Sequence, residues 1–468
     1  VRPSGRSFGG HVGSVWHRHF RAIQKASRRV AGSPHALLAA ALQGIAAALL
    51  HPLIIVAFLV SELSSAPRDV ALVAVIAGAT WYVPSLLNTW LAAYYHRVFP
   101  VALAASFVRV IAASSMAAVM LGSAASDATL ARLVLLALVA YQLASAAFVP
   151  AGNDLIARAT PAEHRARLYR ARWLVGGVSA LLAGAVIAAA LGSDTPPLRE
   201  AFGALFLTAA FAIAGESWFI LRLREPGPAR LSEERAGAIA GSRIREALAV
   251  RGFRRLLVFR VALALAASGD PFLIVYGMSE IAPGRAALGV YVALFAFGAL
   301  VGGAMGLDLS NLGAVRPIFQ FAALLRFATP LLALLFSFLA TGGVVATSVA
   351  AWLFGSVFLL LGLEIAITTA ATQPAVFAVA PAGTRGAAIT LLNVALGVCA
   401  LGPLLGSRLV ERQGIAALLV VAAGLSFVTI MLSGILAPST RRPAPRRQRR
   451  PAPRRARPAQ PRRAVPRR

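Results

Sequence analysis

Charged residues and cysteine are both scarce in this sequence of 468 residues. Only 13% of the residues are charged and 58% are hydrophobic, and the mean hydropathy is +0.74. A water-soluble globular protein of this composition would expose a large apolar surface. Cys399 is the only cysteine, which excludes a disulfide within the chain and a metal site built from cysteines. The solvent that suits such a chain is a lipid bilayer.

Signatures of enzymes and of ATPases are also missing. The sequence contains no phosphate-binding loop of the form GxxxxGK[ST], no HExxH motif and no cluster of Cys and His. We therefore expect no catalytic residue, no metal and no cofactor. Energy for any transport by this chain alone would come from a gradient rather than from ATP.

Apolar stretches of about twenty residues recur along the chain, and each is long enough as a helix to cross about 30 Å of hydrocarbon. Helices are expected because each backbone N–H and C=O group in lipid must be paired within its own segment. The sequence therefore predicts an all-α, polytopic membrane protein with twelve transmembrane helices. The predicted spans are residues 36–60, 69–94, 99–122, 129–152, 172–192, 201–222, 255–279, 285–306, 316–340, 343–371, 386–410 and 414–437.

The net charge of +29 is concentrated in two tails. Residues 441–468 hold thirteen Arg, and residues 1–35 hold six Arg and Lys25, with no acidic residue in either. Because Lys and Arg near the spans mark the cytoplasmic side, we predict a cell-membrane protein with both termini in the cytoplasm. The Arg/Pro-rich tail 438–468 is expected to be disordered and to bind anionic lipids, and no specific nucleic acid is expected.

The two sets of six spans carry matching motifs. The matches are His51-Pro52 with Asp270-Pro271, Pro100 and Arg109 with Pro317 and Arg326, and Pro161 to Arg165 with Pro381 to Arg385. All three pairs are separated by about 217 to 220 residues, which indicates a duplication. We predict two pseudo-symmetric six-helix bundles, 36–222 and 255–437, joined by a polar cytoplasmic loop at 223–254.

The turn after the eighth predicted span carries Gly306, Ser310, Asn311 and Gly313. Their spacing resembles the Gly-x-x-x-Asp-Arg-x-Gly turn of the major facilitator superfamily of secondary transporters, with both glycines kept and both charges replaced. The Pro-x-x-x-Arg elements that end at Arg165 and Arg385 are similar to another motif of that family. The resemblance covers about residues 36–437 and implies alternating access to a central cavity between the two bundles.

His51 and Asp270 lie near the middle of the first and seventh spans, and each precedes a proline that opens the helix locally. The resemblance implies that these two helices face each other. Our hypothesis is that the two side chains form a proton-sensitive pair, since imidazole titrates near neutral pH. The simpler interpretation is a polar contact at two proline kinks.

Further polar residues are candidates for the substrate or proton pathway. Glu364 in the tenth span would act as a coupling carboxylate or substrate contact, or only accept a hydrogen bond from a threonine one turn on. Gln43, Tyr141 and Gln142 would line the pathway, or only bridge neighbouring helices.

Two arginines occupy equivalent places in the third and ninth spans, which support the bundle in the resembled fold. Arg109 and Arg326 are expected to anchor a carboxylate or a carbonyl, and the alternative is binding of an anionic substrate. Glu216 and Arg260 lie near span ends and are expected to reach the membrane surface. Asn153-Asp154 at the end of the fourth span is expected to contact Arg158 or Arg165 in a cytoplasmic gate.

The sequence thus predicts a facilitator-type transporter that moves a small solute by uniport or by proton-coupled transport. Two alternatives stay open. One is a membrane protein of the same fold that assists assembly or delivery of a pigment, lipid or protein. The other is a membrane scaffold anchored by its tails.

Overall fold

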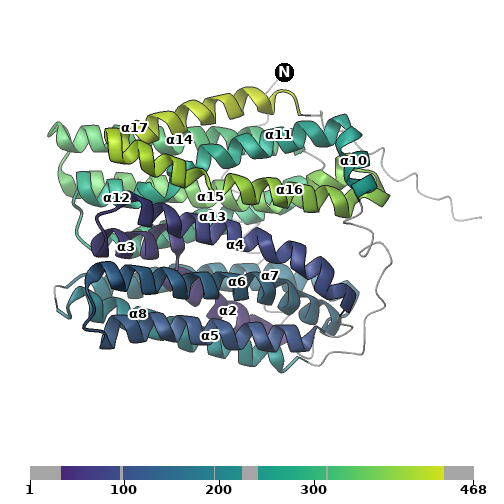
Figure 1. The fold of residues 1–468 in the computed structure, drawn as a ribbon, viewed down its shortest axis with the longest axis horizontal. Helices are drawn as coiled ribbons and strands as arrows, with labels where there is room; N and C mark the ends of the chain where they lie inside the picture. Colours follow the sequence, from purple (N-terminus) through teal and green to yellow (C-terminus); the bar gives the residue numbers. More distant parts are fainter. Residues whose placement is uncertain (1–32, 95–97, 194, 224–240, 312–314, 437–468) are drawn as a thin grey trace, which may run out of the picture.

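The computed structural model describes residues 33–94, 98–193, 195–223, 241–311 and 315–436. The two basic tails and most of the central loop lie outside these residues. Every regular element in the described part is a helix, as the sequence predicts. The helices run side by side along the long axis of the molecule (Figure 1).

The N-terminal half opens with a broken helix. Its elements are α2 (Ser33–Leu49), the π-helix η1 (Pro52–Val56), α3 (Ala57–Leu63), α4 (Pro67–Tyr94), α5 (Phe99–Gly122), α6 (Asp127–Ala159), α7 (Ala162–Leu191) and α8 (Leu198–Leu221). The break lies at His51, whose backbone is extended (φ −60°, ψ 114°). Pro52 causes it, because proline has no N–H to donate and its ring clashes with the preceding turn.

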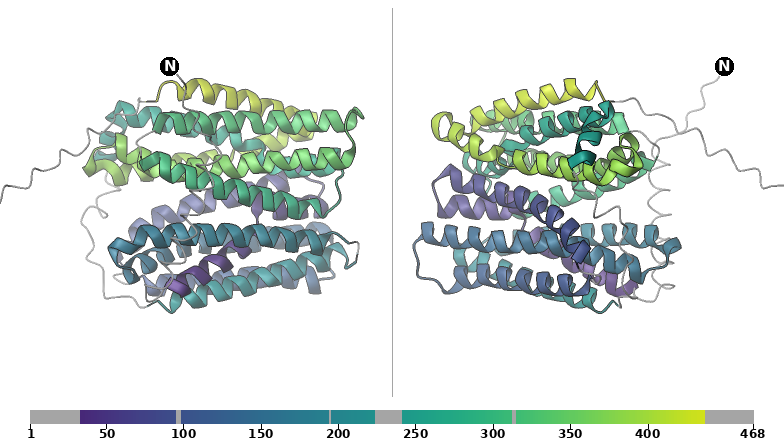
Figure 2. Two further views of the ribbon diagram at one scale, coloured as in Figure 1. Left: turned by 180° about the vertical axis from the view of Figure 1, so that it is seen from behind. Right: turned by 45° about the vertical axis from the view of Figure 1, so that its right-hand side comes forward.

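The C-terminal half repeats this order. Its elements are α10 (Gly241–Ala249), α11 (Arg251–Ala266), η3 (Ala267–Gly269), α12 (Asp270–Glu280), α13 (Ala287–Asn311), α14 (Val315–Thr341), α15 (Thr347–Val379), η4 (Ala382–Thr384), α16 (Arg385–Cys399) and α17 (Gly402–Ser433). The short 3-10 turn η3 replaces helix just before Asp270-Pro271, so both halves break their first span before the repeated proline. The purple and blue helices of the first half form one group, and the green and yellow helices of the second half form another group beside it (Figure 2).

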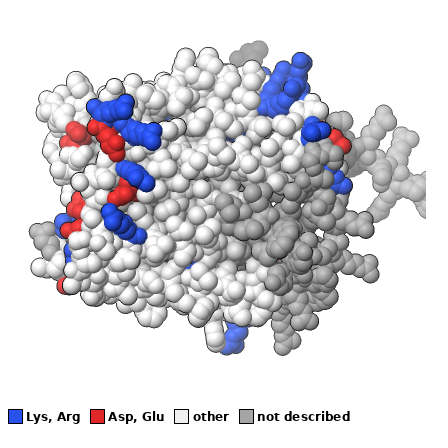
Figure 3. Space-filling view, viewed as in Figure 1, with Lys and Arg blue, Asp and Glu red and all other residues white. Residues whose placement is uncertain are grey.

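Ten stretches of the described chain are long and apolar enough to cross a membrane. The longest, Arg385–Ser433, has 49 residues and includes Gly414, where a positive φ of 84° turns the chain back. That stretch contains both of the last two predicted spans. On the face drawn in Figure 3, charged side chains gather mainly toward the two ends of the molecule and leave the middle uncharged, as a lipid-facing belt requires.

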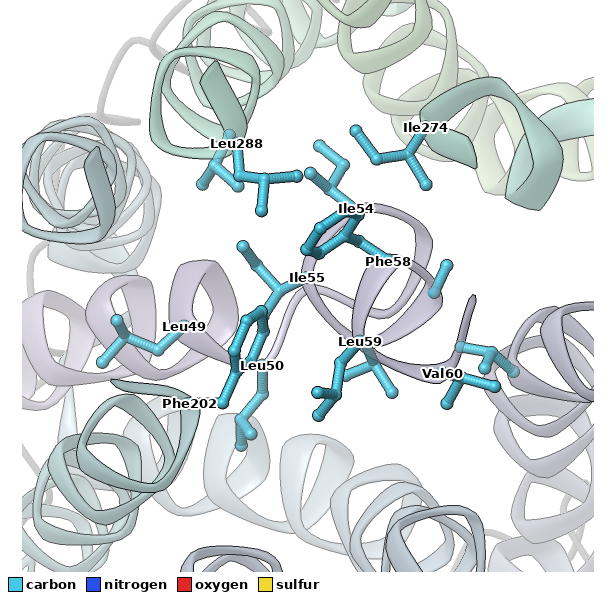
Figure 4. Packing of buried hydrophobic residues seen from close by; sticks show 14 of the residues in the cluster. Leu49, Leu50, Ile54, Ile55, Phe58, Leu59, Val60, Phe202, Ile274 and Leu288 are labelled. Atoms are coloured by element: carbon cyan, nitrogen blue, oxygen red, sulfur yellow. The ribbon is translucent and has the colours of Figure 1, made fainter. Parts of the chain in front are cut away.

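The two halves pack against each other through the parts of the first spans that follow the breaks. Helix α12 contacts η1, α3 and α4, near the end of the bundle that carries the turn at residues 64–66. Figure 4 shows Ile54 and Phe58 of the first half lying opposite Ile274 and Leu288 of the second. Helix α2 instead packs on α7 and α8, and α11 packs on α16 and α17, each within its own half. Helix α4 also crosses to the second half, where it packs on α16 and α17. The contacts of α12 thus form one of several joints between the halves, the one at the 64–66 end.

Helices α7 and α13 form a second joint, in which glycines bring the two backbones together. A Cβ atom added at Gly289 would lie 2.2 Å from the carbonyl oxygen of Gly184, and one added at Gly184 would lie 2.6 Å from the carbonyl oxygen of Gly289. No side chain fits in either place. The indole Nε1 of Trp173 donates to the carbonyl of Leu300 at 3.4 Å further along the same joint.

We predict that Gly289→Ala destabilises the protein relative to Gly424→Ala. Both changes gain helix propensity, roughly 1 kcal/mol. Only the first forces α7 and α13 apart, at an overpacking cost of about 1–3 kcal/mol, because Gly424 has no atom within 4 Å of the added Cβ. The unfolding temperatures of the purified variants in detergent check this, and equal temperatures would contradict the close approach.

Candidate functional site

A buried arginine holds two carboxylates in the C-terminal half. Arg326 of α14 donates through Nη1 to both oxygens of Asp270, at 2.6 and 2.7 Å, and through Nη2 to Glu364 of α15. Thr368, one turn beyond Glu364, donates its hydroxyl to the other Glu364 oxygen at 3.0 Å. All four residues are buried. We call Asp270, Arg326, Glu364 and Thr368 the C-half cluster.

The helix break before α12 positions Asp270 for this contact. Asp270 is the first residue of α12, and Pro271 follows it. Helix α12 packs on α14 of its own half and also on η1, α3 and α4 of the other half. The carboxylate of Asp270 thus lies on the element that joins the halves.

Arg260, one helix earlier on α11, lies within electrostatic range of Glu364 and Arg326. Its Nε is buried and has no hydrogen-bond partner. Sequence reasoning expected this side chain to reach the membrane surface, and that expectation is wrong. With the half-buried Arg260 included, this half holds two guanidinium groups and two carboxylates, whose charges sum to zero.

The N-terminal half has a smaller cluster around the equivalent arginine. Nη2 of Arg109 donates to Glu216 of α8 at 2.8 Å, and Nε donates to the hydroxyl of Ser145 of α6 at 3.2 Å. The guanidinium also lies over the ring of Phe148, at 4.3 Å, and near that of Tyr141, at 5.8 Å. Both arginines that the repeat matches are therefore bound to carboxylates.

Glu216 was missed as a functional residue because its place near the end of a span suggested that it reaches the membrane surface. The structure shows it 2% exposed and paired with Arg109. The signal that could have found it is the arginine itself, because a buried guanidinium requires an anion nearby. Arg172 of α7 was also missed, and it lies within electrostatic range of Glu216.

The proposed pair of His51 and Asp270 is not formed in this structure. Both oxygens of Asp270 are bound to Arg326. The His51 ring lies edge-on against Phe295 of α13, with ring centroids 4.3 Å apart, and its Nδ1 is buried without a hydrogen-bond partner. The stronger attraction of a carboxylate for a guanidinium than for a neutral imidazole explains the difference.

The remaining pathway candidates lie on the first and fourth spans. Gln43 on α2 and Gln142 on α6 are half-buried, whereas Tyr141 is buried beside Arg109. Tyr141 thus belongs to the group of residues around Arg109. The structure shows no direct contact of these three residues with the C-half cluster among the described contacts.

The residues predicted for a gate lie at the end of the bundle opposite residues 64–66. Asp154 accepts from Arg158 at 2.6 Å, as expected, whereas Arg165 donates to the carbonyl of Thr160 at 3.0 Å. Asn153 accepts through its side-chain oxygen from Arg172 at 3.1 Å. The repeat partner of Arg165, Arg385, donates to the carbonyl of Phe377 at 3.2 Å. Each Pro-x-x-x-Arg arginine therefore binds a backbone carbonyl near the end of the preceding helix.

The turn motif is described only in part. Gly306 allows a close approach of α13 to α15, since an added Cβ would lie 2.8 Å from the Cβ of Ala370. The side chains of Ser310 and Asn311, and all of Gly313, lie outside the described residues. No group of three His, Cys, Asp or Glu side chains that could hold a metal ion occurs in the described part of the chain.

Comparison with known proteins shows the fold. No sequence family matches the chain, and no curated protein matches it by sequence. Among solved structures, the chain is similar to an auto-inhibited POT family peptide transporter (12% identity, TM-score 0.65, 88% of this chain and 99% of that one). It is also similar to the nucleoside transporter NupG as a D323A mutant (14% identity, TM-score 0.64, 87% of this chain and 100% of that one). A D-xylose-proton symporter is similar as well (14% identity, TM-score 0.62, 87% of this chain and 97% of that one). The chain has the major facilitator fold.

We predict that Arg326→Met lowers the stability of the protein by about 3–5 kcal/mol, because it leaves two buried carboxylates without their cation. Adding Asp270→Asn and Glu364→Gln to the same chain removes both charges and restores most of the loss. Unfolding temperatures of the single and triple variants check this. The exposed Arg254→Met is the control, and a single variant as stable as this control would contradict the role of Arg326.

Proposed function

We propose that this chain is a secondary transporter that moves a small polar solute across the cell membrane by alternating access, with protons as the coupling ion. Its fold is shared with transporters of peptides, nucleosides and xylose, and solute transport is a function that this fold supports. The observation that carries the coupling ion is the C-half cluster, in which Asp270 and Glu364 share Arg326.

A shared arginine gives the cluster two arrangements that differ by one proton. When both carboxylates are ionised, Arg326 binds both, as in this structure. A proton on either carboxylate removes its ionic contact and leaves Arg326 paired with the other alone. Ionisable residues in membrane interiors commonly serve such proton relays.

Helix α12 connects this chemistry to the joint between the halves. Asp270 begins α12, and α12 contacts η1, α3 and α4 of the other half. Release of Asp270 from Arg326 would free the start of α12 and weaken the joint at the 64–66 end. We infer that the present arrangement is closed at that end, and that the alternate state opens it.

The orientation in the membrane follows from the basic residues. We infer that the end opposite residues 64–66 is cytoplasmic, since the Arg-rich tails and the central loop all attach there. The C-terminal tail would then bind anionic lipids of the inner leaflet. Arg158, Arg165 and Arg385 would act at the cytoplasmic gate.

We predict that Asp270→Asn reduces solute-driven proton flux at least tenfold, because the variant carboxamide cannot exchange a proton or bind Arg326 as an anion. Proteoliposomes loaded with the pH dye pyranine are challenged with uridine, D-xylose, dialanine and lactate. The dye reports proton entry for whichever solute is carried.

The matched control is Glu280→Gln, which removes an exposed carboxylate from the other end of the same helix. It should retain the wild-type rate. Flux that Asp270→Asn leaves unchanged would refute proton coupling at the C-half cluster. A protein that moves none of the four solutes yet co-purifies with a stable partner would favour the assembly alternative.

A further inference from the structure

The charges inside the two halves are unequal when the half-buried Arg172 and Arg260 are counted with the buried residues. In the C-terminal half, Arg260 and Arg326 are matched by Asp270 and Glu364. In the N-terminal half, Glu216 is the single carboxylate near two guanidinium groups, those of Arg109 and Arg172. Away from the ends of the described helices, the N-half therefore carries one positive charge in excess.

Glu216 cannot serve both arginines directly. Its Oε2 binds Nη2 of Arg109 at 2.8 Å, while Arg172 is left with the neutral side-chain oxygen of Asn153 at 3.1 Å and the ring of Tyr169 at 6.0 Å. A carboxamide oxygen satisfies one N–H of a guanidinium but not its charge. Arg172 is thus the cation without a counter-ion.

Unused donors lie on both arginines and on two serines of the same helices as Arg109 and Glu216. Nη1 of Arg109 is buried without a partner, and the side chain that carries it is only 3% exposed. Nε of Arg172 is likewise buried and unpartnered, as are the hydroxyl oxygens of Ser106, one turn before Arg109, and of Ser217, beside Glu216. Buried donors without partners are costly, and a set of them around an excess cation suits an anionic ligand.

We propose that the N-half cluster, formed by Arg109, Arg172, Glu216, Ser106 and Ser217, receives the anionic group of the transported solute, and that this solute is a small carboxylate of single negative charge. The planar fork of a guanidinium matches a carboxylate in geometry. One anion brings the buried charge of the half to zero. This inference rests on the proposed transport function and adds its substrate class.

The two halves therefore have different roles. Solute charge is bound by Arg172, with Arg109 held in place by Glu216 and Ser145, whereas protons are taken up in the C-half cluster. Arg326 thus lies among charges that sum to zero, whereas its repeat partner Arg109 lies in a half with one positive charge in excess. One difference behind this is that the C-terminal half has an acid at the position of His51.

The test is a binding measurement on the purified protein, independent of flux. Acetate, lactate and benzoate are titrated against acetamide, lactamide and benzamide, and the unfolding temperature is recorded. We expect at least one carboxylate to raise the unfolding temperature and its amide to have no effect. Equal effects of acid and amide, or no effect of any of the three acids, overturn the proposal.

Three variants locate the site. Arg172→Gln should weaken carboxylate binding at least tenfold, and Arg172→Lys, which keeps the charge but not the fork, should lie between it and the wild type. Arg167→Gln, an exposed arginine on the same helix, should bind as the wild type does. Undiminished binding by Arg172→Gln places the anion elsewhere and overturns the proposal.

The outcomes separate this inference from the transport function. Carboxylates that bind without moving protons in the pyranine assay would support the site and count against transport. Uridine- or xylose-driven proton flux without carboxylate binding would support transport and overturn the anionic substrate.

Discussion

A guanidinium buried in a membrane protein is stabilised by an anion beside it, and two such pairings organise the molecule. An unpaired charge at mid-bilayer costs roughly 2.5–3.5 kcal/mol even on insertion scales. Arg326 meets the requirement with Asp270 and Glu364, and Arg109 meets it with Glu216. Each pair links helices that are distant in sequence, so each fixes how those helices are rotated and at what depth they lie.

The proline after Asp270 gives this constraint a mechanical consequence. Because the helix restarts at Asp270, the ion pair with Arg326 holds the first residue of a short segment rather than the middle of a long rigid helix. The same segment also contacts the opposite half. Charge pairing inside one bundle and contact between bundles therefore depend on the same few turns.

The glycine joint between α7 and α13 differs in kind from this charged contact. Backbones that meet at Gly184 and Gly289 have no side chains to interlock, so the joint fixes distance but leaves rotation less restricted. A rocking motion about such a joint would open the apolar contact of α12 with η1 and α3. The two halves carry matching motifs but differ in their charged residues.

Local properties of the sequence determined the membrane spans, the paired prolines and the repeat. Hydropathy over twenty residues and the chemistry of proline need no knowledge of neighbours, which is why the all-helical architecture and the equivalent arginines were predicted. The facilitator fold was predicted from the resemblance of the turn motifs. Partner choice was not predicted, as His51, Glu216 and Arg260 show. Side chains on a helix turn about 100° per residue, so a small uncertainty in rotation changes which helix a residue faces. Only the tertiary structure decided that Asp270 meets Arg326 rather than His51, and that Arg172 is left without a carboxylate.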